Sequence, residues 1–415
     1  MSTTTEVIIV GGGFAGVACA RELGRRGIRT LLIDKNSYHQ FQPLLYQVAA
    51  SQIGVSEVTR PLRSIFHRTR NVKVLTAEVA SIDLDSHSVT TTDGHTYPGR
   101  MLVLANGAEP NFFNTPGAQE HAYPLYSIRD ATRLGTALVA ALNTANTEPT
   151  MEHGVRVVVV GGGPTGVEIS GAIAENFKYV VPGYFSPELA EKCSVHLVDM
   201  LPNILTPFDD KSKAYAEKQL RKKGVQLKLG SGVTNVTPGS VTFADDTTLP
   251  ADIVVWAGGL KAGRLIAESG LPLGRGGRVD VSPDLKAPGL QGVYVLGDTA
   301  NMTDAQGNKL PQLGSCAQQA GKWAAKNIAS ELTGGGTKPF EYRDKGYMAM
   351  IGRGAAVAEL GRKRRLVHGP VAFVAWLAVH LVLLSGGRQR ASALISWAED
   401  YLSHSRTHVV LGRAD

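Results

Sequence analysis

Short apolar runs alternate with amphipathic stretches over most of the chain. The runs EVIIV, TLLID, VRVVVV and CSVHLV are short and rich in valine and isoleucine, as expected for buried strands. Stretches with helical spacing of apolar residues follow several of them, as in FAGVACARELGRRG and PTGVEISGAIAE. Because strands that alternate with helices form parallel sheets, the pattern predicts an α/β fold.

The longest apolar run, GPVAFVAWLAVHLVLLSGG, lies near the C-terminus. Its apolar part, 370–384, is only 15 residues long and is interrupted by His380, whereas a helix that spans a bilayer needs about 20 apolar residues. The run is therefore too short to cross a membrane. A core helix and a helix pressed into a membrane surface are the two remaining interpretations.

The residues around this run favour the membrane surface. A second amphipathic helix is predicted after it, with one polar and one apolar face, and basic residues flank the run on both sides. The predicted apolar face carries Ala391, Leu394, Ile395, Ala398 and Leu402, and the predicted polar face carries Arg390, Ser396, Glu399 and Ser403. The flanking basic residues are Arg362, Lys363, Arg364, Arg365, Arg388 and Arg390.

Composition and charge agree with this interpretation. The chain has 415 residues, a hydrophobic content of 43% and a formal net charge of +7, of which residues 361–415 contribute +5. Basicity beside an apolar run fits an anionic membrane surface better than nucleic acid. The three cysteines, Cys19, Cys193 and Cys316, form no close pair, which argues against a dithiol relay and for a reducing cytosol. We expect no export signal and no metal site.

A glycine-rich loop follows the first strand. It reads Gly11-x-Gly13-x-x-Gly16 and opens a helix, and Asp34 closes the next strand 23 residues after Gly11. In such loops the first glycine makes a tight turn, the second admits a pyrophosphate and the third lets helix pack on strand. The acid accepts hydrogen bonds from an adenosine ribose, so this segment predicts a dinucleotide site.

The same pattern returns about 150 residues later. Gly161-x-Gly163-x-x-Gly166 follows a run of valines, and Asp199 closes a later strand. An acid at that strand end, followed by Met200, Leu201 and Pro202 with no arginine, favours NADH, because a 2′-phosphate would need a cation there. Two such loops in one chain imply two dinucleotides, a flavin in the first and a nicotinamide in the second.

A third segment, GVYVLGDTA, ends a strand at Gly297-Asp298, and a helix is expected from about Ser315. An aspartate in this place can hydrogen-bond the ribityl chain of a flavin, and a helix N-terminus stabilises negative charge on the reduced ring. We therefore predict two Rossmann-like domains, the second inserted in the first, and a helical membrane-docking tail. The expected ranges are 1–115 and 286–340 for the FAD domain, 116–285 for the NADH domain and 341–415 for the tail.

These motifs together resemble the single-subunit type II NADH dehydrogenases, a branch of the two-dinucleotide flavoproteins. The resemblance covers LLIDKNSYHQFQPLLYQVAA, GGGPTGVEISG, VYVLGDTA, GYMAMIGRGAAVAEL and the C-terminal WLAVHLVLLSGGRQRASALISWAEDYLSHSR. It implies FAD, NADH and a quinone acceptor, a menaquinone or ubiquinone, with no proton pumping. It also implies monotopic attachment to the cytoplasmic face of the cell membrane and, because family members often dimerise, a homodimer.

The resemblance also assigns individual residues. It places Glu168 near the meeting point of nicotinamide and flavin, with Gln319 and Lys345 as further catalytic candidates. The residues it assigns to FAD are Gly11, Gly13, Gly16, Asp34, Lys35, Asp298 and Ala317; those it assigns to NADH are Gly161, Gly163, Gly166 and Asp199. Further cofactor-binding candidates are Phe14, Ala15, Gln42, Val79, Ala105, Gly107, Gly258 and Gly297.

The helix that forms the quinone site in the family typically reads A-Q-x-A-x-Q, and this chain has Gly314-Ser315-Cys316-Ala317-Gln318-Gln319 in its place. Ser315 lacks the amide that could hydrogen-bond a quinone carbonyl, a loss of about 0.5 to 1.5 kcal/mol. A milder departure is ANGAEP, where A-T-G is usual. These departures leave open a soluble NAD(P)H-dependent flavin reductase for a ferredoxin or a small organic acceptor. A flavoprotein that senses NADH without turnover is a third interpretation.

Overall fold

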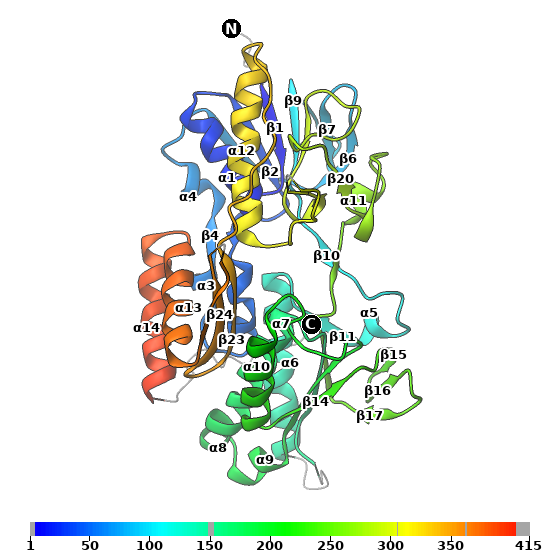
Figure 1. Ribbon diagram of the computed structural model, residues 1–415, viewed down its shortest axis with the longest axis vertical. Helices are drawn as coiled ribbons and strands as arrows, with labels where there is room; N and C mark the ends of the chain where they lie inside the picture. Colours follow the sequence, from blue (N-terminus) through cyan, green and yellow to red (C-terminus); the bar gives the residue numbers. More distant parts are fainter. Residues whose placement is uncertain (1–4, 148–152, 305, 362, 404–415) are drawn as a thin grey trace. The chain divides into compact units, whose positions relative to one another are not determined.

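The computed structural model describes residues 5–147, 153–304, 306–361 and 363–403 (Figure 1). The described residues form two compact units, and each unit is drawn from three separate parts of the chain. Unit 1 takes its residues from 1–40, 60–109 and 260–344; unit 2 takes them from 41–59, 110–259 and 345–415. The predicted domains are defined by the dinucleotide that each would bind, and their boundaries stay a prediction.

A five-stranded parallel sheet forms the centre of unit 1, with the strand order β21-β9-β1-β2-β5. Three of its strands, at 7–10, 101–104 and 293–295, consist of apolar and largely buried residues, as is usual where both faces of a parallel sheet are covered. They are β1 (Val7–Val10), β2 (Thr30–Asp34), β5 (Val72–Thr76), β9 (Met101–Leu104) and β21 (Val293–Val295).

Two helices of unit 1 pack closely on each other. Helix α1 (Phe14–Arg25) meets α12 (Gly314–Leu332) where Gly321 lies against the backbone of Ala15, so close that a Cβ atom on Gly321 would stand 2.2 Å from the Ala15 carbonyl oxygen. The start of α12 at Gly314 confirms the helix expected from about Ser315. Smaller elements of unit 1 include β3 (Tyr38–Gln40), α4 (Leu62–Phe66), α11 (Arg264–Ala267), β20 (Val279–Asp280) and β22 (Ala300–Asn301).

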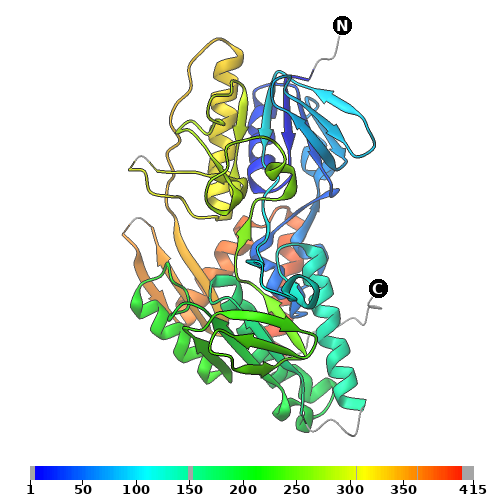
Figure 2. The same cartoon turned by 90° about the vertical axis from the view of Figure 1, so that its right-hand side faces the viewer.

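An antiparallel sheet also belongs to unit 1, and Figure 2 shows its cyan strands beside the parallel sheet. It consists of β6 (Val79–Asp83), β7 (Ser88–Thr91) and β8 (Thr96–Pro98). Val79, Ile82 and Tyr97 pack on the apolar core of the unit.

Unit 2 is built around a second five-stranded parallel sheet, with the order β11-β18-β12-β13-β14. Strands β1 and β12 hold equivalent places, since each lies between the strand that follows its glycine loop and helix and a strand from later in the chain. The strands are β11 (Ala122–Pro124), β12 (Arg156–Val160), β13 (Ser194–Asp199), β14 (Val225–Leu229) and β18 (Ile253–Trp256). The two parallel sheets with their flanking helices confirm the predicted α/β class.

Unit 2 contains further helices and strands besides this sheet. The helices are α2 (Leu45–Ala49), α3 (Val55–Val58), α5 (Ala118–His121), α6 (Ile128–Thr147), α7 (Pro164–Glu175), α8 (Val181–Tyr184), α9 (Pro187–Lys192) and α10 (Asp210–Lys222). A small antiparallel sheet consists of β15 (Val233–Thr237), β16 (Ser240–Phe243) and β17 (Thr248–Pro250).

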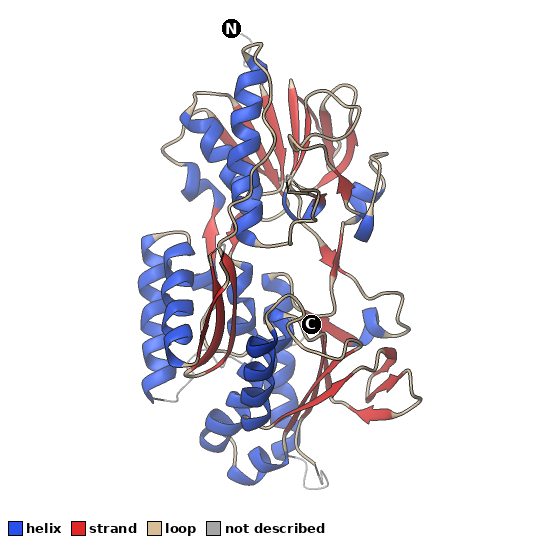
Figure 3. Cartoon of the chain, viewed as in Figure 1, coloured by secondary structure: helices blue, strands red, loops and turns tan. Residues whose placement is uncertain are grey.

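The C-terminal part of unit 2 is an antiparallel sheet followed by two helices. Figure 3 shows the helices, α13 (Pro370–Leu383) and α14 (Gly387–Ser403), beside the strands β23 (Gly346–Gly352) and β24 (Ala355–Leu360). Strand β25 (Arg365–His368) completes the sheet. Both predicted C-terminal helices are therefore present. Arg362 and the residues after 403 lie outside the described residues.

Helix α14 is amphipathic and inverted: polar contacts lie on the face that packs on unit 2, and the apolar face points outward. Its inner face carries polar groups: Ser392 donates to Glu57 at 2.9 Å, the Trp397 indole donates to Gln47 at 2.8 Å, and Asp400 accepts from Gln52 at 3.1 Å. Its outer face is the predicted apolar one, with Leu394 54% exposed, Ile395 68% exposed and Leu402 82% exposed. On α13, Val371, Val374 and Val382 are also more than 60% exposed, which excludes a buried core helix.

Candidate functional sites

The first glycine loop connects β1 to α1. Gly11 has φ +104°, and a Cβ atom there would stand 2.3 Å from the Ala105 carbonyl oxygen, so the tight turn requires glycine. A Cβ atom on Gly16 would stand 1.8 Å from the Gly11 carbonyl oxygen, which keeps helix and strand in contact. At Gly13 a Cβ atom would meet no described atom within 4 Å. The turn and the packing predicted from the motif are therefore present, and the backbone is open at Gly13.

Asp34, at the end of β2, is tied to the same loop. One carboxylate oxygen accepts from the Gly12 N–H and the other from the Asn36 N–H, both at 2.6 Å. Burial raises the pKa of Asp34, and these two backbone hydrogen bonds oppose the rise. The carboxylate is thus held at the edge of the loop, where the prediction needs an acceptor for ribose hydroxyl groups.

The buried side chain of His39, which is not part of the glycine motif, contacts the loop. His39 Nδ1 lies 2.9 Å from the Gly12 carbonyl oxygen, and its ring packs edge-on against Phe14 at 5.2 Å between centroids. Burial lowers the pKa of His39, so the ring is neutral and Nδ1 donates to Gly12. His39 therefore helps fix the loop carbonyl and the predicted cofactor residue Phe14.

Other predicted flavin residues gather around this loop within unit 1. Gly297 has φ +68°, and a Cβ atom there would lie 3.3 Å from the side chain of Ala15 and 3.5 Å from that of Ala317. The carbonyl of Gly107 accepts from Thr299 at 2.9 Å. Beside Gly11, the Asn106 side-chain oxygen is buried and has no hydrogen-bond partner among the described residues. A polar dinucleotide would fit this site, because the site offers open backbone at Gly13, the Asp34 carboxylate and the unpaired Asn106 oxygen.

The second loop repeats the first in detail. Gly161 has φ +111° with the Ala257 carbonyl oxygen 2.5 Å from a built Cβ atom, and at Gly166 the Gly161 carbonyl oxygen would lie at 1.8 Å. Gly163, like Gly13, meets no described atom within 4 Å. The second loop is therefore open to a pyrophosphate at the same place as the first.

In unit 2, Asp199 contacts the backbone of the second loop as Asp34 contacts that of the first loop in unit 1. Its carboxylate accepts from the Gly162 N–H at 2.5 Å and from the Leu201 N–H at 2.7 Å. Met200 and Leu201 beside it are 72% and 43% exposed. A negative charge next to apolar side chains disfavours the 2′-phosphate of NADPH, in agreement with the predicted preference for NADH.

Glu168 lies on α7, two residues after the loop, in a densely packed part of unit 2. Its carboxylate accepts from the Met350 N–H at 3.2 Å. Desolvation raises the pKa of Glu168 to about 8, although the Met350 N–H and the nearby Trp376 indole N–H lower it. The Trp376 indole N–H itself forms no hydrogen bond of good geometry among the described residues. Glu168 is therefore protonated at neutral pH and can supply a proton.

A small cavity adjoins Glu168 and was not predicted. It is partly open to solvent and has room for no more than about one water molecule. A second carboxylate, Glu175, belongs to its wall and accepts from Lys223 and from the Arg353 N–H, both at 2.6 Å. The complete lining is Tyr46, Gln52, Glu168, Ala172, Glu175, Met350, Gly352 and Tyr401. The cavity thus brings together a neutral acid, a second carboxylate that is ion-paired with Lys223, and two phenol groups.

Gln319, predicted as a catalytic residue, lies on α12 in unit 1. Its side-chain amide donates to the Arg343 carbonyl at 3.1 Å and accepts from the Arg343 N–H at 3.0 Å. One turn earlier, the hydroxyl groups of Ser315 and Tyr342 lie 3.2 Å apart. Both sides of the Gln319 amide are thus used to hold the chain at residue 343.

The remaining predicted residues lie in several places. Val79 is on β6, while Lys35 and Lys345 have exposed side chains. Gln42, in unit 2, has a buried side-chain oxygen without a partner among the described residues, which marks it as a candidate ligand of a polar group. Gly258 lies beside the indole ring of Trp256. The roles of these residues stay predictions, as does the catalytic role of Gln319.

Comparison with known proteins agrees with this geometry. Residues 5–321 match the family described as pyridine nucleotide-disulphide oxidoreductase, so the chain is an oxidoreductase of that class. Within it, the chain is 36% identical to the type II NADH:quinone oxidoreductase Ndh of Mycobacterium tuberculosis, over 98% of this chain and 90% of that protein. The protein therefore belongs to the type II NADH:quinone oxidoreductase family. It is also 27% identical to a mitochondrial internal alternative NAD(P)H-ubiquinone oxidoreductase of Solanum tuberosum, over 94% of this chain and 85% of that one.

Solved structures show the same fold. NDH2 from Plasmodium falciparum in complex with NADH matches with a TM-score of 0.88 and 17% identity, over 99% of this chain and all of that one. The sulfide:quinone oxidoreductase from Aquifex aeolicus matches with a TM-score of 0.76, also at 17% identity, over 96% of each chain. At this identity the likeness concerns the fold alone.

Proposed function

We propose that the protein oxidises NADH and reduces a quinone: NADH + H⁺ + quinone → NAD⁺ + quinol. The observation that carries this proposal is the pair of matching loops, each open at its middle glycine and each with an aspartate bound to its backbone, in a chain of the type II family. Two electrons and one proton leave NADH as a hydride ion, and one further proton completes the quinol.

We assign FAD to the loop of unit 1 and NADH to the loop of unit 2. When bound, FAD would serve as the electron carrier, which can accept a hydride ion from NADH and pass two electrons to the acceptor. The chain contributes binding: open backbone at Gly13, the carboxylate of Asp34 for ribose hydroxyl groups, and the buried Asn106 oxygen as a further acceptor. Asp298 and the N-terminus of α12 are assigned to the ribityl chain and to the flavin ring edge.

In unit 2 the chain selects and orients the nicotinamide dinucleotide. Gly163 leaves space for the pyrophosphate, and Asp199 accepts hydrogen bonds from the adenosine ribose while its charge repels a 2′-phosphate. Hydride transfer depends mainly on orientation, so these contacts contribute more than any acid or base.

Glu168 is proposed as the proton source. It is protonated at neutral pH because burial raises its pKa, and the adjoining cavity connects it with Glu175, which is ion-paired with Lys223. A carboxyl group with a pKa near the working pH can both give and regain a proton. The cavity provides a place from which that proton can be replaced.

We further propose that α13 and α14 dock on a lipid surface. The exposed valines of α13 and the exposed leucines and Ile395 of α14 form the apolar part, and the exposed side chains of Arg388 and Arg390 supply positive charge. In the described part of the chain no helix has the length and apolar character that crossing a bilayer demands. Attachment at the cytoplasmic face of the cell membrane and a homodimer remain parts of this proposal.

One observation keeps a second function in view. Ser315 stands where the resemblance expects a glutamine, so a ferredoxin or a small organic molecule is the alternative acceptor. Steady-state oxidation of NADH with a menaquinone, a ubiquinone and ferricyanide, measured side by side on the purified flavoprotein, separates the two functions. We expect turnover with a quinone at least as fast as with ferricyanide. Turnover with ferricyanide but none with either quinone would contradict the proposal.

A further inference from the structure

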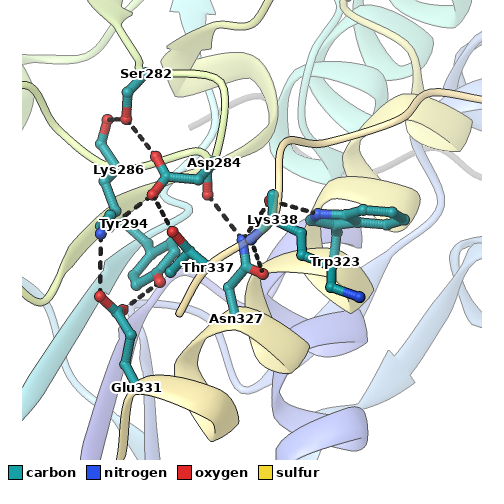
Figure 4. A network of polar contacts seen from close by, with 9 residues as sticks. All are labelled: Ser282, Asp284, Lys286, Tyr294, Trp323, Asn327, Glu331, Thr337 and Lys338. Carbon is teal, nitrogen blue, oxygen red and sulfur yellow. Dashed lines mark hydrogen bonds and ion pairs between the residues drawn. The ribbon is translucent and has the colours of Figure 1, made fainter. Parts of the chain in front are cut away.

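Helix α12 carries a stripe of side chains spaced four residues apart, and each has a polar contact with a part of unit 1 that lies beside the helix. Residues four apart share one face of a helix, so the stripe is continuous. Its members are Ser315, Gln319, Trp323, Asn327 and Glu331. Figure 4 shows the last three in contact with Lys338, Asp284, Lys286 and Tyr294.

Most of these contacts hold one extended segment, residues 337–343, which we call the strap. At its beginning Asn327 donates to the Lys338 carbonyl at 2.9 Å and accepts from the Lys338 N–H at 3.0 Å. At its end Gln319 forms the same pair of bonds with the backbone of Arg343. Each amide thus forms, with one residue of the strap, the two backbone hydrogen bonds that a neighbouring strand would form. The strap is therefore fastened to α12 at both ends.

Between these fastenings the strap is anchored in the core. Phe340 is 4% exposed and packs against Trp323 with 6.0 Å between ring centroids. Just before the first fastening, Thr337 donates to Asp284 at 2.7 Å, as Figure 4 shows. These contacts leave residue 342 little freedom, because it directly precedes the clamped Arg343. The Tyr342 hydroxyl group lies 3.2 Å from that of Ser315 in the first turn of α12.

The first turn of α12 lies next to the first dinucleotide loop. A Cβ atom on Gly314 would stand 3.1 Å from the ring of Phe14, and the side chain of Ala317 lies near Gly297. Ser315 belongs to the same turn, so the hydroxyl pair is close to the loop to which we assign FAD. Ser315 and Tyr342 are both half-buried, so part of each residue reaches the surface.

We infer that the hydroxyl groups of Ser315 and Tyr342 together form the hydrogen-bonding group for the carbonyl oxygen of the quinone, and that Gln319 is a positioning residue that places Tyr342. This inference rests on the proposed function. A quinone oxygen accepts hydrogen bonds, and a hydroxyl group donates one by rotating about its C–O bond. The pair supplies the donor that the missing amide at position 315 would have supplied, and Gln319 uses its own amide on the strap.

The test compares Tyr342→Phe and Ser315→Ala with the full-length flavoprotein, using a short-chain ubiquinone and a short-chain menaquinone. Tyr97→Phe, on β8 of the same unit, is the matched control for loss of a phenol hydroxyl group. We expect kcat/KM for quinone to fall about 3- to 10-fold in each of the two variants, as for loss of one hydrogen bond. Ferricyanide accepts electrons without a carbonyl contact, so its reduction should follow the control.

Three results would overturn the inference. One is a kcat/KM for quinone in both variants within twofold of the Tyr97→Phe value. Another is an equal fall in the stopped-flow rate at which NADH bleaches the flavin, since the hydroxyl pair would then act on the flavin. The third is an equal fall in activity with ferricyanide. Absence of quinone turnover in the unmodified protein, with normal flavin bleaching by NADH, would instead contradict the proposed function.

Discussion

The carboxylate of Glu168 accepts a hydrogen bond from the backbone N–H of Met350, 182 positions later in the chain, at 3.2 Å. This bond fixes an acid from the second loop helix against strand β23. Since one backbone bond does not compensate for burial, the pKa of Glu168 stays well above its ordinary value.

The first prediction concerns the pH dependence of stability. The pKa of Glu168 rises from 4.5 to about 8, so the folded protein holds this proton more tightly than the unfolded chain does, and stability falls as pH rises from about 5 to 8. Glu168→Gln should remove this part of the slope. Melting temperatures from pH 5 to 9 measure it, with Glu188→Gln, an exposed residue of α9, as control. Equal slopes in all three proteins would contradict the assigned pKa.

The second prediction uses the two open glycines. Gly13→Ala and Gly163→Ala add a methyl group that meets no described atom within 4 Å, so both proteins should fold. Gly13→Ala should lose FAD, because the methyl group fills the space for the pyrophosphate. Gly163→Ala should keep the flavin and show a raised KM for NADH. Absorbance at the flavin band and steady-state kinetics measure the two effects. Loss of flavin in Gly163→Ala would refute the assignment of the loops.

The third prediction concerns the choice of nicotinamide. In Asp199→Asn, an NH₂ group replaces one of the oxygens that accept from Gly162 and Leu201, and the charge is lost. We expect kcat/KM for NADH to fall about 10- to 100-fold, as for a hydrogen bond to a charged group, and the preference over NADPH to shrink. Asp210→Asn, at a side chain 97% exposed, is the control. An unchanged ratio of the two cofactors would show that Asp199 does not read the ribose.

The fourth prediction compares the two amide clamps of α12. In Gln319→Glu, a carboxylate oxygen would face the Arg343 carbonyl and release the strap near Tyr342. Quinone kcat/KM should fall severalfold while the melting temperature changes little. Asn327→Asp affects a clamp that is 4% exposed, so it should cost about 1 to 3 kcal/mol of stability. The reverse pattern, with quinone kinetics sensitive to Asn327→Asp alone, would argue against the role of Gln319.

The fifth prediction concerns the lipid surface. Val382→Asp and Ile395→Asp place a charge on side chains that are each 68% exposed, so the fold should be kept. Each should weaken binding to phosphatidylglycerol vesicles about 10-fold or more, since burial of such a side chain contributes roughly 1.5 to 3 kcal/mol. Leu273→Asp, at an exposed site of unit 1, is the control. Vesicle flotation equal to that of the control would place the attachment elsewhere.

The sequence predicted those parts of the site that depend on neighbours in the chain. The glycine loops, Asp34 and Asp199 follow from spacing because strand, turn and helix are local structures. The apolar face of α14 follows from helical periodicity. The cavity beside Glu168 could not be predicted, because Tyr46, Met350 and Tyr401 come from distant segments of the chain.

The strap was also missed, although part of its signal was present. Ser315, Gln319, Trp323, Asn327 and Glu331 recur every fourth residue, which marks one face of α12. Their partners, however, belong to an extended segment with no periodicity. From the sequence, Gln319 is a candidate catalytic residue. In the structure, both the nitrogen and the oxygen of its side-chain amide are hydrogen-bonded to the backbone of Arg343.

The inverted helix α14 has a thermodynamic consequence. Its polar side chains are satisfied by Glu57, Gln47 and Gln52, while its apolar side chains face outward. In water this helix is held by the burial of Ala393 and Trp397 and by these hydrogen bonds, which contribute only about 0.5 to 1.5 kcal/mol each. On the docking proposal, lipid binds the native arrangement and not the unfolded chain, so the bilayer acts as a stabilising ligand whose effect grows with its concentration. The melting temperature of this protein is then a property of the protein and the lipid together.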